Sequence, residues 1–196
     1  MESVIRVLGK LFYNVRSGDA KLLTKVLKVD QIIPQIEISS SLFKNDGYMP
    51  IETAGVGVGD NKSPPLTIHF ENDIRIKSYV IVVQDIDPPL PSPITHLLAY
   101  NISPETTTFE LNEFDGSKSD KFILGISFRG RKGYCGPRPV IGHGDHRYVF
   151  QVYAINEDAT SKLEDQNEDL TTERLVQIIE GNIIKYGTLT GLYKRD

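Results

Sequence analysis

The side chains best suited to hold a ligand lie in one glycine- and proline-rich stretch that leads into a predicted strand. Residues 133–139 read Gly-Tyr-Cys-Gly-Pro-Arg-Pro, and the strand at 147–155 is introduced by His146 and contains Tyr148. Glycines let backbone N–H groups approach a ligand closely, while His146 and Tyr148 add directional hydrogen-bond donors. The pattern predicts half of a small binding pocket at the mouth of a β-scaffold, and it matches no familiar catalytic centre.

The same stretch is strongly cationic, although the whole chain carries a net charge of -4. Between residues 129 and 147 the only acidic residue is Asp145. The basic residues in this interval are Arg129, Arg131, Lys132, Arg138 and Arg147. Charge-assisted hydrogen bonds to a phosphate oxygen are roughly twice as strong as neutral ones. The local charge therefore favours a phosphate or sulfate monoester as the ligand.

A second set of polar residues lies before this stretch, where a predicted buried strand at 79–83 runs on to Asp85 and Asp87. The two carboxylates start on one face of an extended chain, so at least one needs a hydrogen-bond donor or water. Asp87 precedes a proline and is interpreted mainly as a turn residue, whereas Asp85 is an equally good candidate for binding a ligand. The peptide bond before Pro89, at the same tight exit from the strand, is predicted to be cis.

His96 begins the next predicted strand and completes the candidate site. A hydrogen bond to Asp85 would fix the tautomer of His96 and favour its charged form. A buried core histidine and a ligand contact are equally good interpretations of this residue. The same pair carries the alternative function, because Asp85 and His96 could serve as the acid–base pair of a hydrolase or isomerase.

Other recognised chemistries have little support in the sequence. The glycines of 55–60 fit neither dinucleotide nor Walker spacing, and the histidines show no metal-ligand signature. Cys135 could act as a nucleophile with His146 as its base, but a lone cysteine beside Gly-Pro is more often structural. No Gly-x-Ser-x-Gly motif is present. We therefore predict a protein that is not an enzyme, with no catalytic residues, no metal and no cofactor.

The elements that position these residues are predicted to be mostly β-strands. Runs in which apolar residues alternate or are continuous lie at 66–70, 79–83, 96–102, 121–128 and 147–155. Turn signals separate the runs, which predicts a β-sandwich or barrel rather than alternating strands and helices. An acidic stretch at 157–170 is interpreted as a solvated loop, and Thr171 or Thr172 is expected to cap a helix that ends near Lys185.

Residues 1–30 form a predicted helical arm, and residues 31–196 form the main domain. Apolar residues repeat at helical spacing from Val4 to Val15, a Ser-Gly-Asp break follows, and a second short helix is expected to extend to Leu27. The arm is interpreted as an amphipathic cover over part of the core, with a targeting peptide as the weaker alternative.

Length, charge and cysteine content restrict the class of protein. A chain of 196 residues with 39% hydrophobic residues suits one domain with an appendage. The net charge of -4 gives no support for a nucleic-acid partner. The single cysteine fits a reducing compartment, and neither a secretory signal nor an apolar run of about 18 residues is visible. We therefore predict a cytoplasmic protein with no membrane span.

Taken together, these segments resemble the phosphatidylethanolamine-binding protein (PEBP) family, which includes the Raf kinase inhibitor protein and the plant flowering regulators. One family signature reads Asp-Pro-Asp-x-Pro before a His-led strand, and residues 85–89 here read Asp-Ile-Asp-Pro-Pro before His96. The other reads Tyr-x-Gly-Pro-x-Pro, a glycine turn and His-Arg-Tyr-x-Phe, which is the pattern of 134–150. Further stretches resemble the bacterial and archaeal branch: 46–50, 63–66 and 189–193. The resemblance spans roughly 34–193.

The resemblance implies a PEBP-like β-sandwich with a large central sheet, a smaller flanking sheet and peripheral helices. It also implies a pocket for phosphate or a phosphoethanolamine head group, lined by Asp85, His96, Gly136, Pro137, His146 and Tyr148. Family members act mostly as binders or inhibitors, so the resemblance implies a regulator that associates directly with a kinase or a protease. Peripheral contact with a lipid membrane stays open.

Two residues depart from the family pattern. Ile86 replaces the first proline of the aspartate signature and is expected to loosen that turn. Arg138 stands where the family usually carries a small or apolar residue or a cysteine. Its guanidinium is expected either to strengthen anion binding or to cover the mouth of the pocket.

Overall fold

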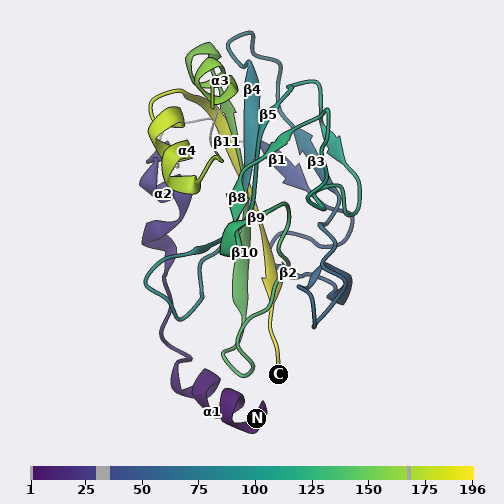
Figure 1. Cartoon of the computed structure of the whole chain (residues 1–196), viewed down its shortest axis with the longest axis vertical. Coiled ribbons are helices and arrows are strands. Elements are labelled where there is room, and N and C mark those ends of the chain that lie inside the picture. The colour runs from purple at the N-terminus through teal and green to yellow at the C-terminus, as the bar shows by residue number, and fades with distance from the viewer. Residues whose placement is uncertain (1, 30–35, 167–168) are drawn as a thin grey trace.

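A six-stranded sheet forms the centre of the molecule and runs along its long axis (Figure 1). The structure is a computed structural model that describes residues 2–29, 36–166 and 169–196. In spatial order the strands are β2 (Gly47–Tyr48), β11 (Ile183–Tyr193), β10 (His146–Ile155), β4 (Ser78–Asp85), β5 (Ile94–Ile102) and β7 (Ile123–Leu124). Neighbours are antiparallel, except that β2 and β11 are parallel.

Smaller sheets and helices flank this central sheet. One small sheet contains β1 (Glu37–Ser39), β3 (Leu66–His69) and β6 (Thr108–Phe109), and another contains β8 (Ile126–Ser127) and β9 (Arg131–Lys132). The helices are α1 (Glu2–Leu11), α2 (Leu23–Val26), α3 (Glu157–Glu164) and α4 (Thr172–Ile179), with short 3-10 turns at Asp19–Lys21, Ile51–Thr53 and Phe128–Gly130. The predicted fold, mostly β with a large central sheet, a smaller flanking sheet and peripheral helices, is confirmed.

The core lies on both faces of the central sheet. All eight residues of β4 are buried, as expected for a continuous apolar run in a central strand. Tyr79, Ile81 and Val83 pack toward the sheet of β1 and β3, whereas Val80 and Val82 pack toward α2, α3 and α4. Figure 1 shows these layers on opposite sides of the central strands. Alternation along β4 therefore sends successive side chains into two separate apolar clusters.

Two predictions near the C-terminus are wrong. Residues 157–164 of the expected acidic loop form α3, because the Asn156 side chain accepts a hydrogen bond from the Ala159 N–H at the helix start and one face of the helix is buried. The helix capped by Thr171 ends at Ile179 rather than near residue 185. A turn with positive φ at Gly181 follows it, and the chain enters β11, whose long-range pairing with β10 overrides the local helical pattern.

The N-terminal arm has two parts with different contacts: the first contains α1 and the turn after it, up to Arg16, and the second runs from Ser17 through α2. Leu23 and Leu27 of the second part are buried in the core cluster beneath the helices, as expected for an amphipathic cover. In contrast, Leu11 at the end of α1 is 73% exposed, and Phe12 is 44% exposed. The boundary predicted between residues 30 and 31 lies outside the described residues.

The peptide bond before Pro89 and the lengths of the helices were also predicted from the sequence. The cis peptide bond predicted before Pro89 is wrong: the bond is trans, and the turn is closed by the Leu90 N–H, which donates to the Pro88 carbonyl at 2.7 Å. Among the helices that the structure describes, none is long and apolar enough to cross a membrane.

Candidate functional site

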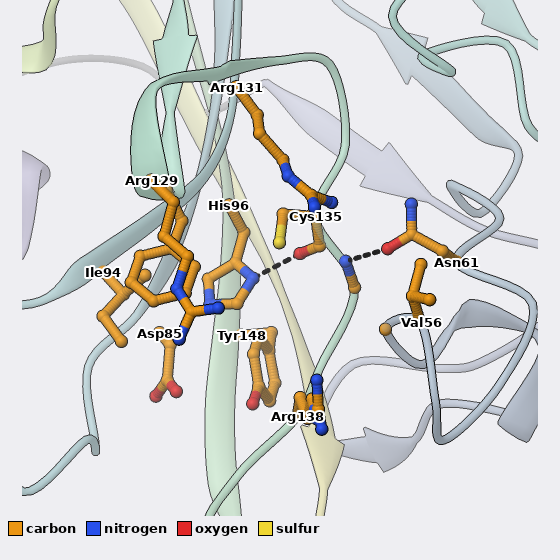
Figure 2. Close-up of a pocket in the computed structure, with 13 residues that line it drawn as sticks. Val56, Asn61, Asp85, Ile94, His96, Arg129, Arg131, Cys135, Arg138 and Tyr148 are labelled. Atoms are coloured by element: carbon orange, nitrogen blue, oxygen red, sulfur yellow. Dashed lines mark hydrogen bonds between the residues drawn. The ribbon is translucent and has the colours of Figure 1, made fainter.

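A cavity of about 470 Å³ opens at the end of the central sheet. Its floor comes from the end of β4, the start of β5 and the start of β10, which contribute Asp85, His96 and Tyr148. One wall is the loop 128–138, and the opposite wall is the glycine-rich loop 55–61 (Figure 2). Segments far apart in the sequence therefore meet at one sheet end, where exposed loops can present ligand contacts.

His96 presents an unbonded ring nitrogen at this cavity. Its Nδ1–H donates to the Cys135 carbonyl, which fixes the tautomer and leaves Nε2 buried with no hydrogen-bond partner. Burial lowers the pKa of His96, although the nearby Asp85 carboxylate opposes that shift. The ring is therefore neutral near neutral pH, and its Nε2 lone pair is available to accept a hydrogen bond.

Tyr148 presents a second orphaned polar atom. Its side chain is 1% exposed, and its hydroxyl has no hydrogen-bond partner in the structure. The edge of its ring packs on His96, with ring centroids 5.1 Å apart. Burial, together with the nearby Asp85 carboxylate, raises the pKa of Tyr148 well above its ordinary value, so the hydroxyl keeps its proton. A buried polar atom without a partner costs about 1–3 kcal/mol, and two facing one cavity indicate a ligand site.

Arginines without acidic partners surround the cavity. Arg129, Arg131 and Arg138 are exposed at its rim and make no ion pair with the described carboxylates. By contrast, Lys132 pairs with Asp169 at 2.5 Å, and Arg147 pairs with Asp87 at 2.8 Å. Of the five basic residues in the predicted stretch, Arg129, Arg131 and Arg138 therefore keep a positive charge that no described carboxylate neutralises.

Asp85 is bonded to His146 rather than to His96. One carboxylate oxygen, Oδ2, accepts from His146 Nδ1 at 2.8 Å, and Oδ1 accepts from the Asp87 N–H at 2.9 Å. The predicted Asp85–His96 hydrogen bond is therefore absent. The physical reason is the register of β4 and β5, which shifts after Val83 and places Ile94 opposite Asp85.

The structure thus divides the predicted site residues into two groups. Asp85, His96, Gly136 and Tyr148 line the cavity. His146 is 1% exposed and lies behind Asp85, with its Nε2 at 2.7 Å from Nδ1 of His143. Pro137 also lies outside the lining, and its carbonyl accepts from the Gly55 N–H at 2.9 Å.

Several residues of the cavity were missed from the sequence. The loop 55–61 supplies Asn61, whose Oδ1 accepts from the Gly136 N–H at 2.8 Å. Gly136 itself is packed so closely that a Cβ there would lie 2.2 Å from the Thr53 carbonyl oxygen. Ile94 and Phe128 add an apolar side to the cavity. The glycines of both loops were the only sequence signal for this close backbone approach.

The cavity has no activated nucleophile among its described residues. Burial raises the pKa of the Cys135 thiol, although Arg131 and Arg129 oppose the shift, so sulfur is held as the thiol rather than the reactive thiolate. In the part of the chain that the structure describes, no three His, Cys, Asp or Glu side chains are grouped to hold a metal ion. The arrangement offers a donor, an acceptor and three cations, which can bind an anion.

The chain is similar to known proteins in sequence and in fold. The family model described as phosphatidylethanolamine-binding protein matches residues 39–194. A UPF0098 protein of Pyrococcus horikoshii is 40% identical over 158 residues, which cover 80% of this chain and 75% of that protein. Phomoidride biosynthesis cluster protein B of a fungal species is 29% identical over 203 residues, covering 95% of this chain and 92% of that protein. A crystal structure of a PEBP homolog from Chlamydia trachomatis has a TM-score of 0.70 and 27% identity, covering 83% of this chain and 99% of that one.

Proposed function

Because this chain belongs to the phosphatidylethanolamine-binding protein family, we propose that it is a non-enzymatic binding protein whose cavity holds a phosphate-type anion. The observation that carries the proposal is the pair of buried, unpartnered polar atoms, His96 Nε2 and Tyr148 Oη, at one cavity. A ligand that bonds to both would remove their desolvation cost.

The charges around the cavity favour an anion. Arg129, Arg131 and Arg138 bring three positive charges to the rim, against the single carboxylate of Asp85 in the floor. A phosphate oxygen can accept from the Tyr148 hydroxyl and from the guanidinium groups, while a protonated phosphate oxygen can donate to His96 Nε2. The ligand that matches this set is a phosphate monoester with one proton, or a phosphate that brings a proton to His96.

The geometry supports binding more than the alternative hydrolase or isomerase. An acid–base pair must lie within hydrogen-bonding reach of the group on which it acts. Here both carboxylate oxygens of Asp85 are engaged by His146 and by the backbone of Asp87, and His96 is oriented by a carbonyl instead. The thiol of Cys135, whose pKa is raised by burial, offers no substitute nucleophile.

The partner class is proposed from the family alone. We propose that the loaded protein regulates a kinase or a protease by direct association, with the ligand taken as free phosphate or as a phosphoethanolamine head group. No nucleic-acid partner is proposed for a chain of net charge -4. A cytoplasmic location remains the proposal, on the basis of the single cysteine.

Isothermal titration calorimetry with phosphate and with phosphoethanolamine tests the site. We expect the wild type to bind both, and His96→Ala to weaken binding by about 10- to 100-fold, the value of one charged hydrogen bond. His69→Ala is the matched control, because His69 is exposed in β3, outside the cavity lining. Equal affinity of wild type and His96→Ala would remove the site assignment. Turnover of a small phosphoester that is abolished by Asp85→Asn would establish the enzymatic alternative instead.

A further inference from the structure

A buried chain of three side chains connects the cavity to the N-terminal arm. Asp85 lines the cavity and accepts from His146, and His146 contacts His143 at 2.7 Å. At the other end, Nε2 of His143 lies 2.8 Å from the Phe12 carbonyl oxygen and 3.2 Å from that of Val15. Asp85, His146 and His143, here called the trio, are each at most 3% exposed. A broken contact within the trio would therefore leave a buried polar group without a partner.

Counting protons along the trio gives a definite requirement. Carbonyl oxygens only accept, so Nε2 of His143 must carry a proton. The contact between the two imidazoles needs a second proton, and the contact between His146 and Asp85 needs a third. An ionised Asp85 with two neutral imidazoles supplies only two. All the contacts are satisfied together only when the trio takes up one further proton from solvent, which makes it electrically neutral.

We propose that the trio holds this extra proton when the arm is docked, and that His143 thereby couples the position of the arm to the charge of the anion cavity. When the arm is undocked, only the His143–His146 and His146–Asp85 contacts remain, and two neutral imidazoles supply the two protons that these contacts need. Docking of the arm therefore takes up a proton, and the docked population rises as the pH falls.

Charged and titratable groups surround the trio, and the paired ones among them balance one another. The other charged or titratable groups packed around it are Arg16, Asp87, Asp145, Arg147, His96 and Tyr148. Arg147 pairs with Asp87 and with Asp19, each at 2.8 Å, and Arg16 lies 3.3 Å from Asp87, so two arginines are matched by two carboxylates. Burial lowers the pKa of His143 below its ordinary value, and the hydrogen bonds to the Phe12 and Val15 carbonyls act against that shift. The extra proton is therefore assigned to the trio as a unit, from the number of its contacts.

The first part of the arm depends on this contact more than the second part does. From Ser17 onward the arm has other anchors: the Ser17 N–H donates to Pro88 at 3.1 Å and the Gly18 N–H donates to Ile86 at 2.9 Å. Arg16 is also anchored, since it donates to the Asp145 carbonyl at 2.7 Å and lies 3.3 Å from Asp87. The chain before Arg16 approaches the loop around His143, where a Cβ on Gly9 would lie 2.1 Å from the Ile141 carbonyl oxygen. The segment that a lost proton would release is therefore α1 and the turn after it.

The coupling to the cavity rests on the proposed anion binding. An anion beside Asp85 makes the local potential more negative and favours the extra proton on the trio. By linkage, a docked arm must strengthen anion binding by the same factor by which the anion strengthens docking.

Hydrogen–deuterium exchange of residues 6–15 in the full chain tests the proton without any ligand. We expect the protection of this segment in the wild type to fall about 10-fold or more between about pH 5.5 and about pH 8.5. In His143→Gln the amide N–H₂ donates to the arm carbonyls at every pH, so the group that holds the arm no longer titrates and the protection of this segment should lose most of its pH dependence. His69→Gln, on the exposed surface, should behave as the wild type does.

Two results would overturn the proposal. One is the same pH dependence of protection in wild type and His143→Gln. The other is a nitrogen-15 NMR spectrum of the histidines in the docked wild type that shows only two protons on the trio; this measurement also serves if His143→Gln does not fold. Both measurements are made without ligand, so they do not depend on phosphate binding. If phosphate fails to bind, the proposed function and the coupling to the cavity are refuted, but the extra proton that links the trio to the docked arm is not.

Discussion

Replacing Tyr148 with phenylalanine should weaken phosphate binding without lowering the stability of the folded protein. The substitution removes one oxygen and keeps the ring, which is packed edge-on against His96. That oxygen is buried and has no partner in the structure, so the folded protein loses no hydrogen bond. The free energy of unfolding should therefore not fall, and it should rise by up to about 1 kcal/mol as a desolvation cost is removed. For a chain of this length, 1 kcal/mol corresponds to about 2–4 °C in Tm.

Phosphate affinity should change in the other sense. The Tyr148 hydroxyl keeps its proton because burial raises its pKa, so it can donate a charge-assisted hydrogen bond to a bound anion. Its loss should weaken phosphate binding by about 10- to 100-fold. Scanning calorimetry measures the stability, and titration calorimetry with phosphate measures the affinity.

Tyr153→Phe is the matched control for this experiment. Tyr153 lies in the same strand and is fully buried, but its hydroxyl donates to Oε1 of Gln151 at 2.7 Å. Its removal should destabilise the protein by about 1 kcal/mol and leave phosphate affinity unchanged. If Tyr148→Phe destabilises the protein as Tyr153→Phe does, or binds phosphate as the wild type does, the orphaned hydroxyl is not a ligand contact.

Three further perturbations test other parts of the structure. Asp87→Asn should lower the free energy of unfolding at pH 7, measured by chemical denaturation, by about 2–3 kcal/mol. Burial acts to raise the pKa of Asp87, but the hydrogen bonds from Arg147 outweigh burial and lower that pKa. The stability difference between wild type and variant should therefore disappear as the pH falls below 3.8. Gly136→Ala should destabilise the loop and abolish phosphate binding in calorimetry, because its Cβ would lie 2.2 Å from a facing carbonyl oxygen. Alkyl phosphates should bind about fourfold more tightly per buried methylene in titrations, because Ile94 is shared between the cavity and an adjoining groove; Ile94→Ser should remove this increment but leave the affinity for phosphate itself unchanged.

Local patterns explain how much of the fold could be predicted from the sequence. The run at 79–83 is apolar at every position, which identifies a strand covered on both faces whatever its neighbours are. The strand at 183–193 was missed because its apolar residues also fit a helix, and only its pairing with β10 distinguishes the two. The acidic residues at 157–164 hid a helix for a similar reason, since its burial depends on a sheet face far away in sequence.

The candidate site divides in the same way. The basic stretch of 129–147, the aspartates after β4 and the His-led strand were visible as residue types at fixed spacing, and they were sufficient to indicate the family. The spacing could not show which cations stay free. Lys132 and Arg147 are neutralised by Asp169 and Asp87, and those partners are brought near only by folding.

The sequence alone determined the strand-rich character of this protein, its cationic loop and the residues from which an anion site could be built. Only the tertiary structure decided that Asp85 bonds to His146 instead of His96, and that His143 extends this contact to the arm. The physical reason is that hydrophobic periodicity and residue type belong to short segments, whereas the partner of a buried polar group depends on the register between distant strands. In the observed register Ile94 rather than His96 lies opposite Asp85, and the carboxylate bonds to the histidine that begins β10.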